Sequence, residues 1–451
     1  MPQSPLARVS PRTPSSFRKS LPSVAALAQA AVVLVTTVFG GSAGGITPKG
    51  DSGAGSLVRG TSFGPSLYSR PVSELQDYRE RFPILADTTY LINHSLGAMP
   101  AAAEERVLEY ARAWNTRGVR AWEEGWWEMS LTVGDQIARL IGAPPGSVSM
   151  HQNVTIAEAV VISCFGFDGP RRRIVYEEGN FPSVRYLYQA QRGADILVAA
   201  DDEGVVEAID ERTLLVPVTH VLFKTGQIQD VEAIVAKAHE EGAHVVLDAY
   251  QSVGTVPLDV TSLGVDFAVG GSVKWLCGGP GAGWLYVRSD LAPTLEPALT
   301  GWQAHARPFA FDPEQDYAEG AARFLTGTPN VPALYAATAG YDIVEEVGIA
   351  RIRQRSQEQT ALLVELLDEA GYPVGSPRDP ARRGGTVVVQ VPGSKQVNRG
   401  LGERGVICDW RPDVGLRFGP HFFNTDDELR FAVEQIVELS RRGARSAAAR
   451  S

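Results

Sequence analysis

The chain has 451 residues, of which 44% are hydrophobic and 21% are charged, and its formal net charge at pH 7 is −10. The composition is that of a globular protein with ample material for a core, and the length predicts two or three domains. The negative charge excludes general nucleic-acid binding, which needs a basic face. The three cysteines, Cys164, Cys277 and Cys408, form no CxxC pair and no metal-ligand spacing. We therefore expect no disulfide framework and no metal site, and a reducing compartment fits them.

Residues 1–72 differ from the rest because they are rich in Ser, Pro, Gly and Ala. Four basic residues precede an apolar run, Val24–Phe39, which is followed by "GGSAGG". This order resembles a signal peptide, but the run is too short and too alanine-rich to predict a stable membrane span. We interpret 1–72 as a disordered leader, a signal-like segment or an over-long gene start. The expected location is cytoplasmic, or exported if the segment is a true signal peptide.

The globular part starts near residue 73, where "TTYLINHSLGAMP" predicts a short strand and a turn. Residues 101–142 have helical periodicity, interrupted by the tryptophan-rich "RGVRAWEEGWWEM". Short β-branched runs such as "RRIVYEEG", "TLLVPVTHV" and "AHVVLDAYQ" then alternate with amphipathic stretches. Continuously apolar strands in such an alternation indicate an α/β fold with a mostly parallel sheet covered on both faces. We assign this large domain to residues 73–328.

A second, smaller unit follows at residues 329–440. A long amphipathic stretch, about 331–370, precedes three short strand patterns, "TVVVQV", "GVICDW" and "GLRFGP". In the last helical pattern, Thr425 followed by acids is a good helix start. These features predict a small C-terminal α+β domain, and residues 441–451 read as a disordered tail.

Two residues of the large domain suggest its chemistry. Asp248 ends the apolar strand "HVVLD", and Lys274 lies between two glycine clusters in "GGSVKWLCGGPG". Ligands of α/β proteins bind at the carboxyl ends of parallel strands. There, a lysine can form a Schiff base with pyridoxal 5′-phosphate (PLP), and an acid can keep the pyridine nitrogen protonated. The alternative is a strand-end acid and a glycine-rich hairpin that are unrelated to chemistry.

Three other segments carry residues suited to the same cofactor. "QNVTIAEAVV" opens a helix at Thr155, and a helix N-terminus can bind phosphate. Phe181 follows a strand and can stack on a pyridine ring, and Arg417 can hold a substrate carboxylate in its two-pronged donor geometry. Each also has an ordinary interpretation: a capped helix, a core aromatic residue, and a structural arginine.

Over residues 75–440 the order and spacing of these motifs resemble those of kynureninases and, more widely, of the class V aminotransferase family of fold-type-I PLP enzymes. The segments that carry the resemblance include "SLGAMP", "GWWEM", "VTIAEA", "NFPS", "FKTGQIQD", "LDAYQSVGTVPLD", "VDFAVGGSVKWLCGGPGA", "GWQAHARPFAF", "RFLTGTP" and "LRFGP". The resemblance implies a small amino-acid substrate and a homodimer with shared active sites. The net charge and the short apolar run predict no nucleic-acid partner and no stable membrane span.

The resemblance also implies a role for each matching residue. Lys274 would form the Schiff base and act as the catalytic base, and Asp248 would pair with the pyridine nitrogen. The other implied cofactor contacts are Val154 and Thr155 at the phosphate, Phe181 on the ring, Thr219 near the phosphate, Gln251 at the ring oxygen, and Trp302 and Thr328 toward the neighbouring subunit's cofactor. The implied substrate contacts are Arg417, His94 and Ser95.

The chain departs from the kynureninase pattern at several of these positions. Val273 stands where kynureninases have a tyrosine, Val184 where they have an acid, and Gln251 where they have a histidine. "NHSLG" replaces "GNSLG", which makes His94 either a new substrate or acid–base contact or a structural histidine. Valine can neither bind phosphate nor relay a proton, so the departures argue against hydrolysis of kynurenine itself.

Three functions stay open: kynureninase-like cleavage or substitution at the β-carbon of an L-α-amino acid, a class V aminotransferase or racemase-type enzyme of specialised metabolism, and a non-catalytic scaffold. Retention of Lys274, Asp248 and Arg417 argues against a scaffold, which needs none of them. A cysteine desulfurase is disfavoured because Cys408 lies in an apparent strand and Cys277 in the glycine turn, where thiols are usually inert.

Overall fold

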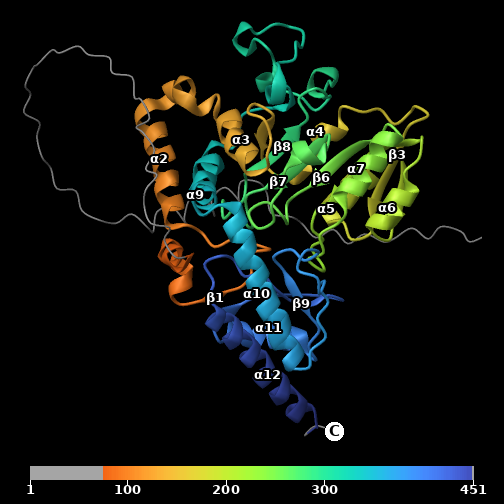
Figure 1. The fold of residues 1–451 in the computed structure, drawn as a ribbon. Coiled ribbons are helices and arrows are strands. Elements are labelled where there is room, and N and C mark those ends of the chain that lie inside the picture. Colours follow the sequence, from red (N-terminus) through yellow and green to blue (C-terminus); the bar gives the residue numbers. More distant parts are fainter. Residues whose placement is uncertain (1–74, 449–451) are drawn as a thin grey trace, which may run out of the picture. The chain divides into compact units, whose positions relative to one another are not determined.

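A seven-stranded sheet forms the centre of the computed structural model, which describes residues 75–448 (Figure 1). Its strands, in spatial order, are β2 (Val148–His151), β8 (Gly283–Val287), β7 (Phe267–Gly271), β6 (His244–Asp248), β5 (Thr213–Thr219), β3 (Arg173–Glu177) and β4 (Asp195–Ala199). Within this sheet β8 runs in the opposite direction to the other six strands. The predicted α/β class with a mostly parallel sheet is confirmed.

Helices cover both faces of the sheet because successive strand residues point to opposite sides. In β6, Val245 and Leu247 belong to one core, whereas Val246 belongs to the other. The first core includes residues of α3 (Met129–Leu140), α6 (Asp202–Ala208), α7 (Val231–Glu240), α8 (Val260–Leu263) and α9 (Val331–Val347). The second core includes residues of α4 (Val154–Ile162) and α5 (Pro182–Gln189).

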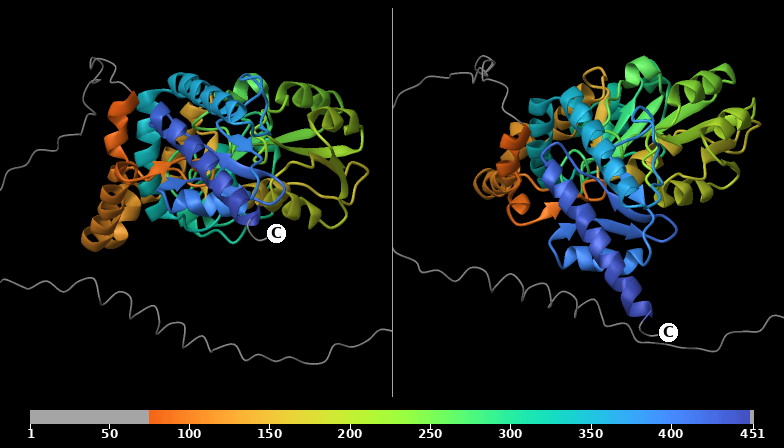
Figure 2. Two further views of the ribbon diagram at one scale, coloured as in Figure 1. Left: turned by 90° about the horizontal axis from the view of Figure 1, so that it is seen from below. Right: turned by 60° about the horizontal axis from the view of Figure 1, so that its bottom comes forward.

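A smaller antiparallel sheet follows, with the order β11 (Asp409–Arg411), β12 (Gly415–Phe418) and β9 (Val387–Val389). Its core is completed by residues of α10 (Ile349–Glu369), α11 (Ser394–Gly402) and α12 (Asp426–Ala448). Figure 2 shows α10 and α12 side by side over this sheet. The smaller C-terminal sheet agrees with the predicted α+β arrangement.

The strand predicted in "TTYLIN" is present as β1 (Thr89–Tyr90), but it joins the C-terminal region. It pairs in parallel with β10 (Val406–Ile407), and Leu91 is buried in the core of the small sheet. The sequence pattern predicted the strand and not its partner, because the two strands are far apart along the chain. The two strands form a separate two-stranded sheet, and through Leu91 the segment before the large sheet contributes to the core of the small sheet.

The amphipathic stretch at 331–370 forms two helices, because Gly348 has φ 84° and separates α9 from α10. Helix α9 packs against α2 (Ala101–Arg117) and α3, and its buried residues belong to the core of the large sheet. The sequence analysis assigned this helix to the small domain, because it placed the domain boundary at 328/329. The predicted leader, 1–72, lies outside the described residues, and the predicted tail, 441–451, begins within α12. None of the helices within residues 75–448 is long and apolar enough to cross a membrane.

Helix α9 lies directly against the turn that follows Lys274. A Cβ atom at Gly340 would lie 2.1 Å from the carbonyl oxygen of Leu276. This distance is far below van der Waals contact, and the neighbouring atom is backbone that cannot rotate away. The glycine therefore allows the helix to support the lysine turn at close range.

Gly340→Ala is expected to destabilise the protein by about 1–3 kcal/mol, because the clash outweighs the higher helix propensity of alanine. The thermal unfolding midpoint measures this. The matched control is Gly327→Ala, since a Cβ atom at Gly327 would meet no atom within 4 Å. Equal midpoints for the two variants would contradict the close approach.

Candidate active site

Lys274 and Asp248 meet at the carboxyl end of the large sheet. Asp248 is the last residue of β6, and Lys274 follows shortly after β7, the parallel neighbour of β6. Both line a cavity of about 650 Å³. The same cavity is lined by every other predicted site residue except Trp302 and Thr328: His94, Ser95, Val154, Thr155, Phe181, Thr219, Gln251 and Arg417.

The Lys274 amine is held close to two aromatic rings. Its Nζ atom lies 4.3 Å from the ring centroid of Tyr250 and 5.7 Å from that of Phe181. Burial lowers the pKa of Lys274 from its ordinary value of 10.5 to about 7, the charge of Arg417 lowers it as well, and Asp248 opposes the shift. Near neutral pH a substantial fraction of this amine is therefore neutral and able to accept a proton.

The N-terminus of α4 provides amide donors at the cavity. The Asn153 side chain caps the helix by accepting a hydrogen bond from the Ile156 amide at 3.1 Å. Among the described residues, none accepts a hydrogen bond from the amides of Val154 and Thr155. Gly283 allows the turn to approach β8, since a Cβ there would lie 2.7 Å from the Asn153 Cα atom. Free amides at a helix N-terminus suit a phosphate group.

Thr219 and Phe181 provide two further features that fit PLP. The Thr219 hydroxyl oxygen is buried and has no hydrogen-bond partner among the described residues, so it can bond to a ligand in the cavity. The Phe181 side chain is 41% exposed although it is a large apolar ring, and it contacts Phe223 edge to face. A ring that lines a cavity in this way can stack on a flat cofactor.

The Asp248 carboxylate is oriented by its own chain. Its Oδ1 atom accepts a hydrogen bond from the Tyr250 amide at 2.8 Å. Burial raises the pKa of Asp248, whereas this amide and Lys274 lower it. A protonated pyridine nitrogen beside Asp248 would compensate the cost of burying the carboxylate.

Gln251 joins the cavity to the N-terminal segment. Its Nε2 atom donates to the carbonyl of His94 at 3.1 Å, and its Oε1 atom accepts from the indole nitrogen of Trp275 at 3.3 Å. One hydrogen on Nε2 is left for a ligand. Ser95 lines the cavity and is half-buried.

Arg417 and His94 both contact Asp409. The Arg417 guanidinium donates from Nε to Oδ1 at 2.8 Å and from Nη2 to Oδ2 at 2.5 Å, and its Nη1 atom donates to the Phe223 carbonyl at 2.7 Å. The buried His94 ring lies with Nε2 at 3.3 Å from Asp409 Oδ1. Burial lowers the pKa of His94 to about 4, so the neutral ring donates this bond.

Trp302 and Thr328 lie elsewhere. They line a separate cavity of about 610 Å³ together with aromatic residues of the tryptophan-rich segment, Trp122 and Trp127, and with Phe309. Within one chain the structure does not bring them to Lys274. Their predicted contact with a neighbouring subunit's cofactor stays a prediction.

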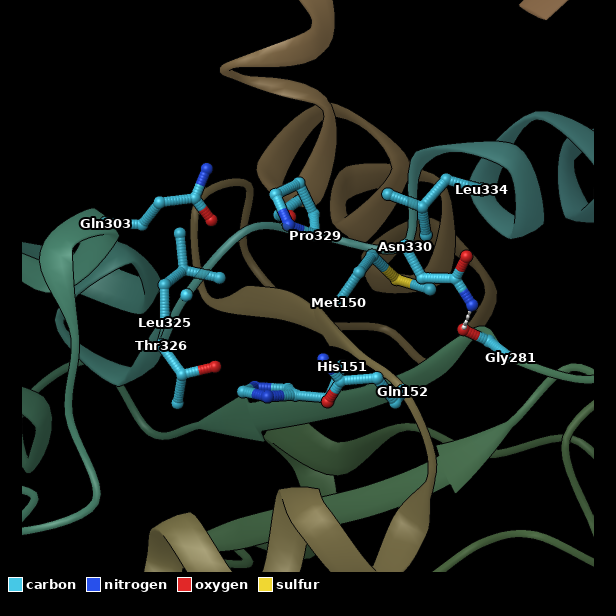
Figure 3. Close-up of a pocket in the computed structure, with 12 residues that line it drawn as sticks. Met150, His151, Gln152, Gly281, Gln303, Leu325, Thr326, Pro329, Asn330 and Leu334 are labelled. Atoms are coloured by element: carbon cyan, nitrogen blue, oxygen red, sulfur yellow. Dashed lines mark hydrogen bonds between the residues drawn. The ribbon is translucent and has the colours of Figure 1, made fainter. Parts of the chain in front are cut away.

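A third, much smaller cavity lies between β2 and the loop that contains Thr328 (Figure 3). Its volume is about 10 Å³, which is near the minimum for one water molecule. His151 and Thr326 line it, and Asn330 donates to the Gly281 carbonyl at 3.3 Å. A cavity of this size has no room for an amino acid or a cofactor, and the Asn330 hydrogen bond connects the loop to the segment before β8.

Sequence reasoning missed several residues of the large cavity. Tyr250, Phe223, Ser183, Asp409 and Arg411 line it or bond to residues that do. The spacing of Asp409 and Arg411 in the strand "CDWR" could have indicated that both lie on the same face as each other, because alternate strand residues share a face. Val184, in contrast, is buried in the second core and does not line the cavity.

The aminotransferase class-V family model matches residues 89–409. A kynureninase of Pseudomonas fluorescens is 33% identical over 383 residues, which cover 81% of this chain and 92% of the relative. An uncharacterized aminotransferase of Bacillus subtilis, YcbU, is 32% identical over 80% of this chain and 97% of its own length. The chain therefore belongs to the aminotransferase class-V family, and the predicted family and enzyme class are confirmed.

Solved structures agree with this fold. A cysteine desulfurase from Thermococcus onnurineus superimposes with a TM-score of 0.72 at 24% identity, over 83% of this chain and 99% of the other. C-DES, in a mutant form with glycine linked covalently to its PLP cofactor, gives a TM-score of 0.73 at 21% identity, over 80% and 99%. The predicted fold type is confirmed by these likenesses.

In the cofactor-free protein, we expect Lys274 to react with trinitrobenzenesulfonate with a midpoint near pH 7, because burial lowers its pKa to about 7. Asp248→Asn removes an anion that favours the ammonium form, so the midpoint should fall further. Peptide mass spectrometry across pH measures both. Asp290→Asn, at an exposed acid paired with Arg288, is the control that leaves the midpoint unchanged. A wild-type midpoint near 10 would show that the amine is not desolvated.

Proposed function

We propose that this protein is a PLP-dependent enzyme that acts on an L-α-amino acid and breaks or forms a bond at its β-carbon, as the kynureninase resemblance predicts. The observation that carries the proposal is one cavity lined by Lys274, Asp248 and the α4 N-terminus. PLP is the cofactor of this chain, and when bound it acts as an electron sink for charge that develops at the substrate's α-carbon.

The residues of the cavity fit the parts of this cofactor. The free amides of Val154 and Thr155 and the unpaired hydroxyl of Thr219 would hold the phosphate group. The Asp248 carboxylate would face the pyridine nitrogen, and the exposed ring of Phe181 would stack on the pyridine ring. These assignments repeat the predicted roles and are supported by the common cavity.

Lys274 and Tyr250 divide the proton transfers between them. The partly neutral amine of Lys274 can remove the proton from the substrate's α-carbon. Burial raises the pKa of Tyr250 to about 12, so its hydroxyl keeps its proton at neutral pH. No described residue hydrogen bonds to that hydroxyl, which leaves it able to donate to a group leaving the β-carbon. Val273 also lines the cavity but offers no proton.

The alternative is an aminotransferase, which the similarity to YcbU favours. Transamination needs proton transfers that Lys274 can perform unaided. A desulfurase is supported less, because burial raises the pKa of Cys277 to about 12 and raises that of Cys408 still more. Neither thiol lines the Lys274 cavity.

The proposed working unit is a cytoplasmic homodimer. Trp302 and Thr328 line a cavity without Lys274, as expected of residues that serve a neighbouring cofactor. Trp302, Phe309 and Phe311 are 45%, 62% and 74% exposed, which is unusual for large apolar rings unless another surface covers them.

One experiment tests the function directly. The holoenzyme is treated with borohydride, and we expect the peptide that contains Lys274 to carry the cofactor's mass. The untreated enzyme is then mixed with a panel of L-amino acids that includes kynurenine, and products are identified by mass. Cleavage or substitution at the β-carbon supports the proposal, whereas conversion of the cofactor to its amine form supports the alternative. A colourless protein that ignores added PLP would refute both.

Two substitutions separate the roles of the two proton-transfer groups. Lys274→Ala should abolish turnover and borohydride labelling. Tyr250→Phe should lower kcat by about 10²–10⁴-fold, the usual contribution of a general acid, while cofactor affinity is retained because the ring remains. Tyr186→Phe, at a tyrosine that is 68% exposed, is the matched control. An unchanged kcat in Tyr250→Phe would remove the hydroxyl from the reaction.

A further inference from the structure

Strands β11 and β12 bring three charged side chains to one face of the small sheet. Asp409 lies directly opposite Arg417 in the antiparallel register, and Arg411 lies opposite Gly415. Because alternate residues share a face, Asp409 and Arg411 point to the same side, and Trp410 points to the other. Arg411 and Arg417 both line the cavity that contains Lys274.

Asp409 links the two arginines. Its carboxylate accepts two hydrogen bonds from Arg417 and one from His94, and the Arg411 Nη2 atom lies 3.0 Å from Oδ2. The side chains of Asp409 and Arg417 are only 9% and 4% exposed, whereas that of Arg411 is 47% exposed. Asp409 is thus fixed from three directions, and Arg411 reaches toward the open part of the cavity.

Both arginines keep N–H donors that are free to bind a ligand. The Nε and Nη2 atoms of Arg417 each donate one hydrogen bond to the Asp409 carboxylate. Its Nη1 atom donates one hydrogen bond to the Phe223 carbonyl. One hydrogen on each terminal nitrogen of Arg417 stays without a partner among the described residues. The Arg411 guanidinium forms an ion pair with Asp409 and donates from Nη1 to the Trp410 carbonyl at 3.3 Å, and it keeps further donors free.

We propose that Arg411 and Arg417 together bind the substrate's carboxylate and that Asp409 is the positioning residue that holds them as a pair. This inference rests on the proposed function, because it takes Arg417 as the carboxylate site. Two arginines and one aspartate have a net charge of +1, and His94 adds none because it is neutral. One carboxylate neutralises this cluster, so the preferred substrate is an amino acid with an uncharged side chain.

Acidic amino acids are disfavoured by the same charge count. Apart from the two arginines, the only cation that lines the cavity in the described part of the chain is Lys274. Lys274 is committed to the cofactor. A second carboxylate would therefore lose its hydration without gaining an ionic partner.

The test measures binding of unreactive carboxylates to the holoenzyme by ligand-observed NMR, with propionate and succinate as probes. Arg411→Met keeps the aliphatic stem and removes the charge, and it should weaken propionate binding by about 10-fold. Arg411→Lys should recover part of the affinity, since it restores charge without the fork. The matched control, Lys395→Met, removes a cation that lies 5.6 Å from the Trp410 ring and does not line the cavity, and it should bind propionate as the wild type does.

Asp409→Asn provides a readout that a merely structural role would not change. It raises the cluster's charge to +2, so the preference between the probes should shift toward succinate by about 10-fold. Unaltered propionate affinity in Arg411→Met, or an unaltered preference in a folded Asp409→Asn variant, would overturn the proposal. If Asp409→Asn does not fold, the two Arg411 variants decide. Absence of PLP on Lys274 would instead refute the proposed function, and the NMR titration detects the carboxylate site independently of turnover.

Discussion

The proposed active site depends on burying a lysine and an aspartate together in one cavity, near the ends of two adjacent parallel strands. Burial disfavours the charge of both Lys274 and Asp248, and each partly restores the charge of the other. The parallel pairing of β6 with β7 sets their separation, and the glycine contact between α9 and the lysine turn supports it. Near neutral pH, a substantial fraction of the Lys274 amine is consequently uncharged and able to accept a proton.

The small sheet contributes a second buried charged group to the cavity region, but here the buried carboxylate is paired with cations. There, burial of Asp409 is compensated by two arginines and a neutral histidine, and its pKa is held well below the usual range. The cavity thus lies between Lys274, whose pKa is lowered by burial, and the arginines that neutralise the Asp409 carboxylate. In the proposed function, a substrate contacts residues of both sheets at once, and this would orient it relative to Lys274.

Sequence reasoning predicted the elements that depend on local pattern and short motifs. The apolar strands, the helix start at Thr155, and the grouping of Lys274 with Asp248 were accessible, because strand ends of a parallel sheet converge on one edge. The family resemblance added Arg417, which lies in the small sheet. Sequence reasoning could not foresee that Arg417 has an ionic partner already, that His94 is buried against Asp409, or that Tyr250 lies beside the amine. Those facts depend on register and side-chain direction, which spacing alone does not determine.

The pairing of β1 with β10 has a consequence for the making of the protein. Its two strands, at residues 89–90 and 406–407, are separated by almost the whole described chain. The core around Leu91 therefore cannot close while the ribosome is still adding the C-terminal residues. Until synthesis ends, the early strand stays unpaired, which makes it a point where chaperones can act and where assembly is slow.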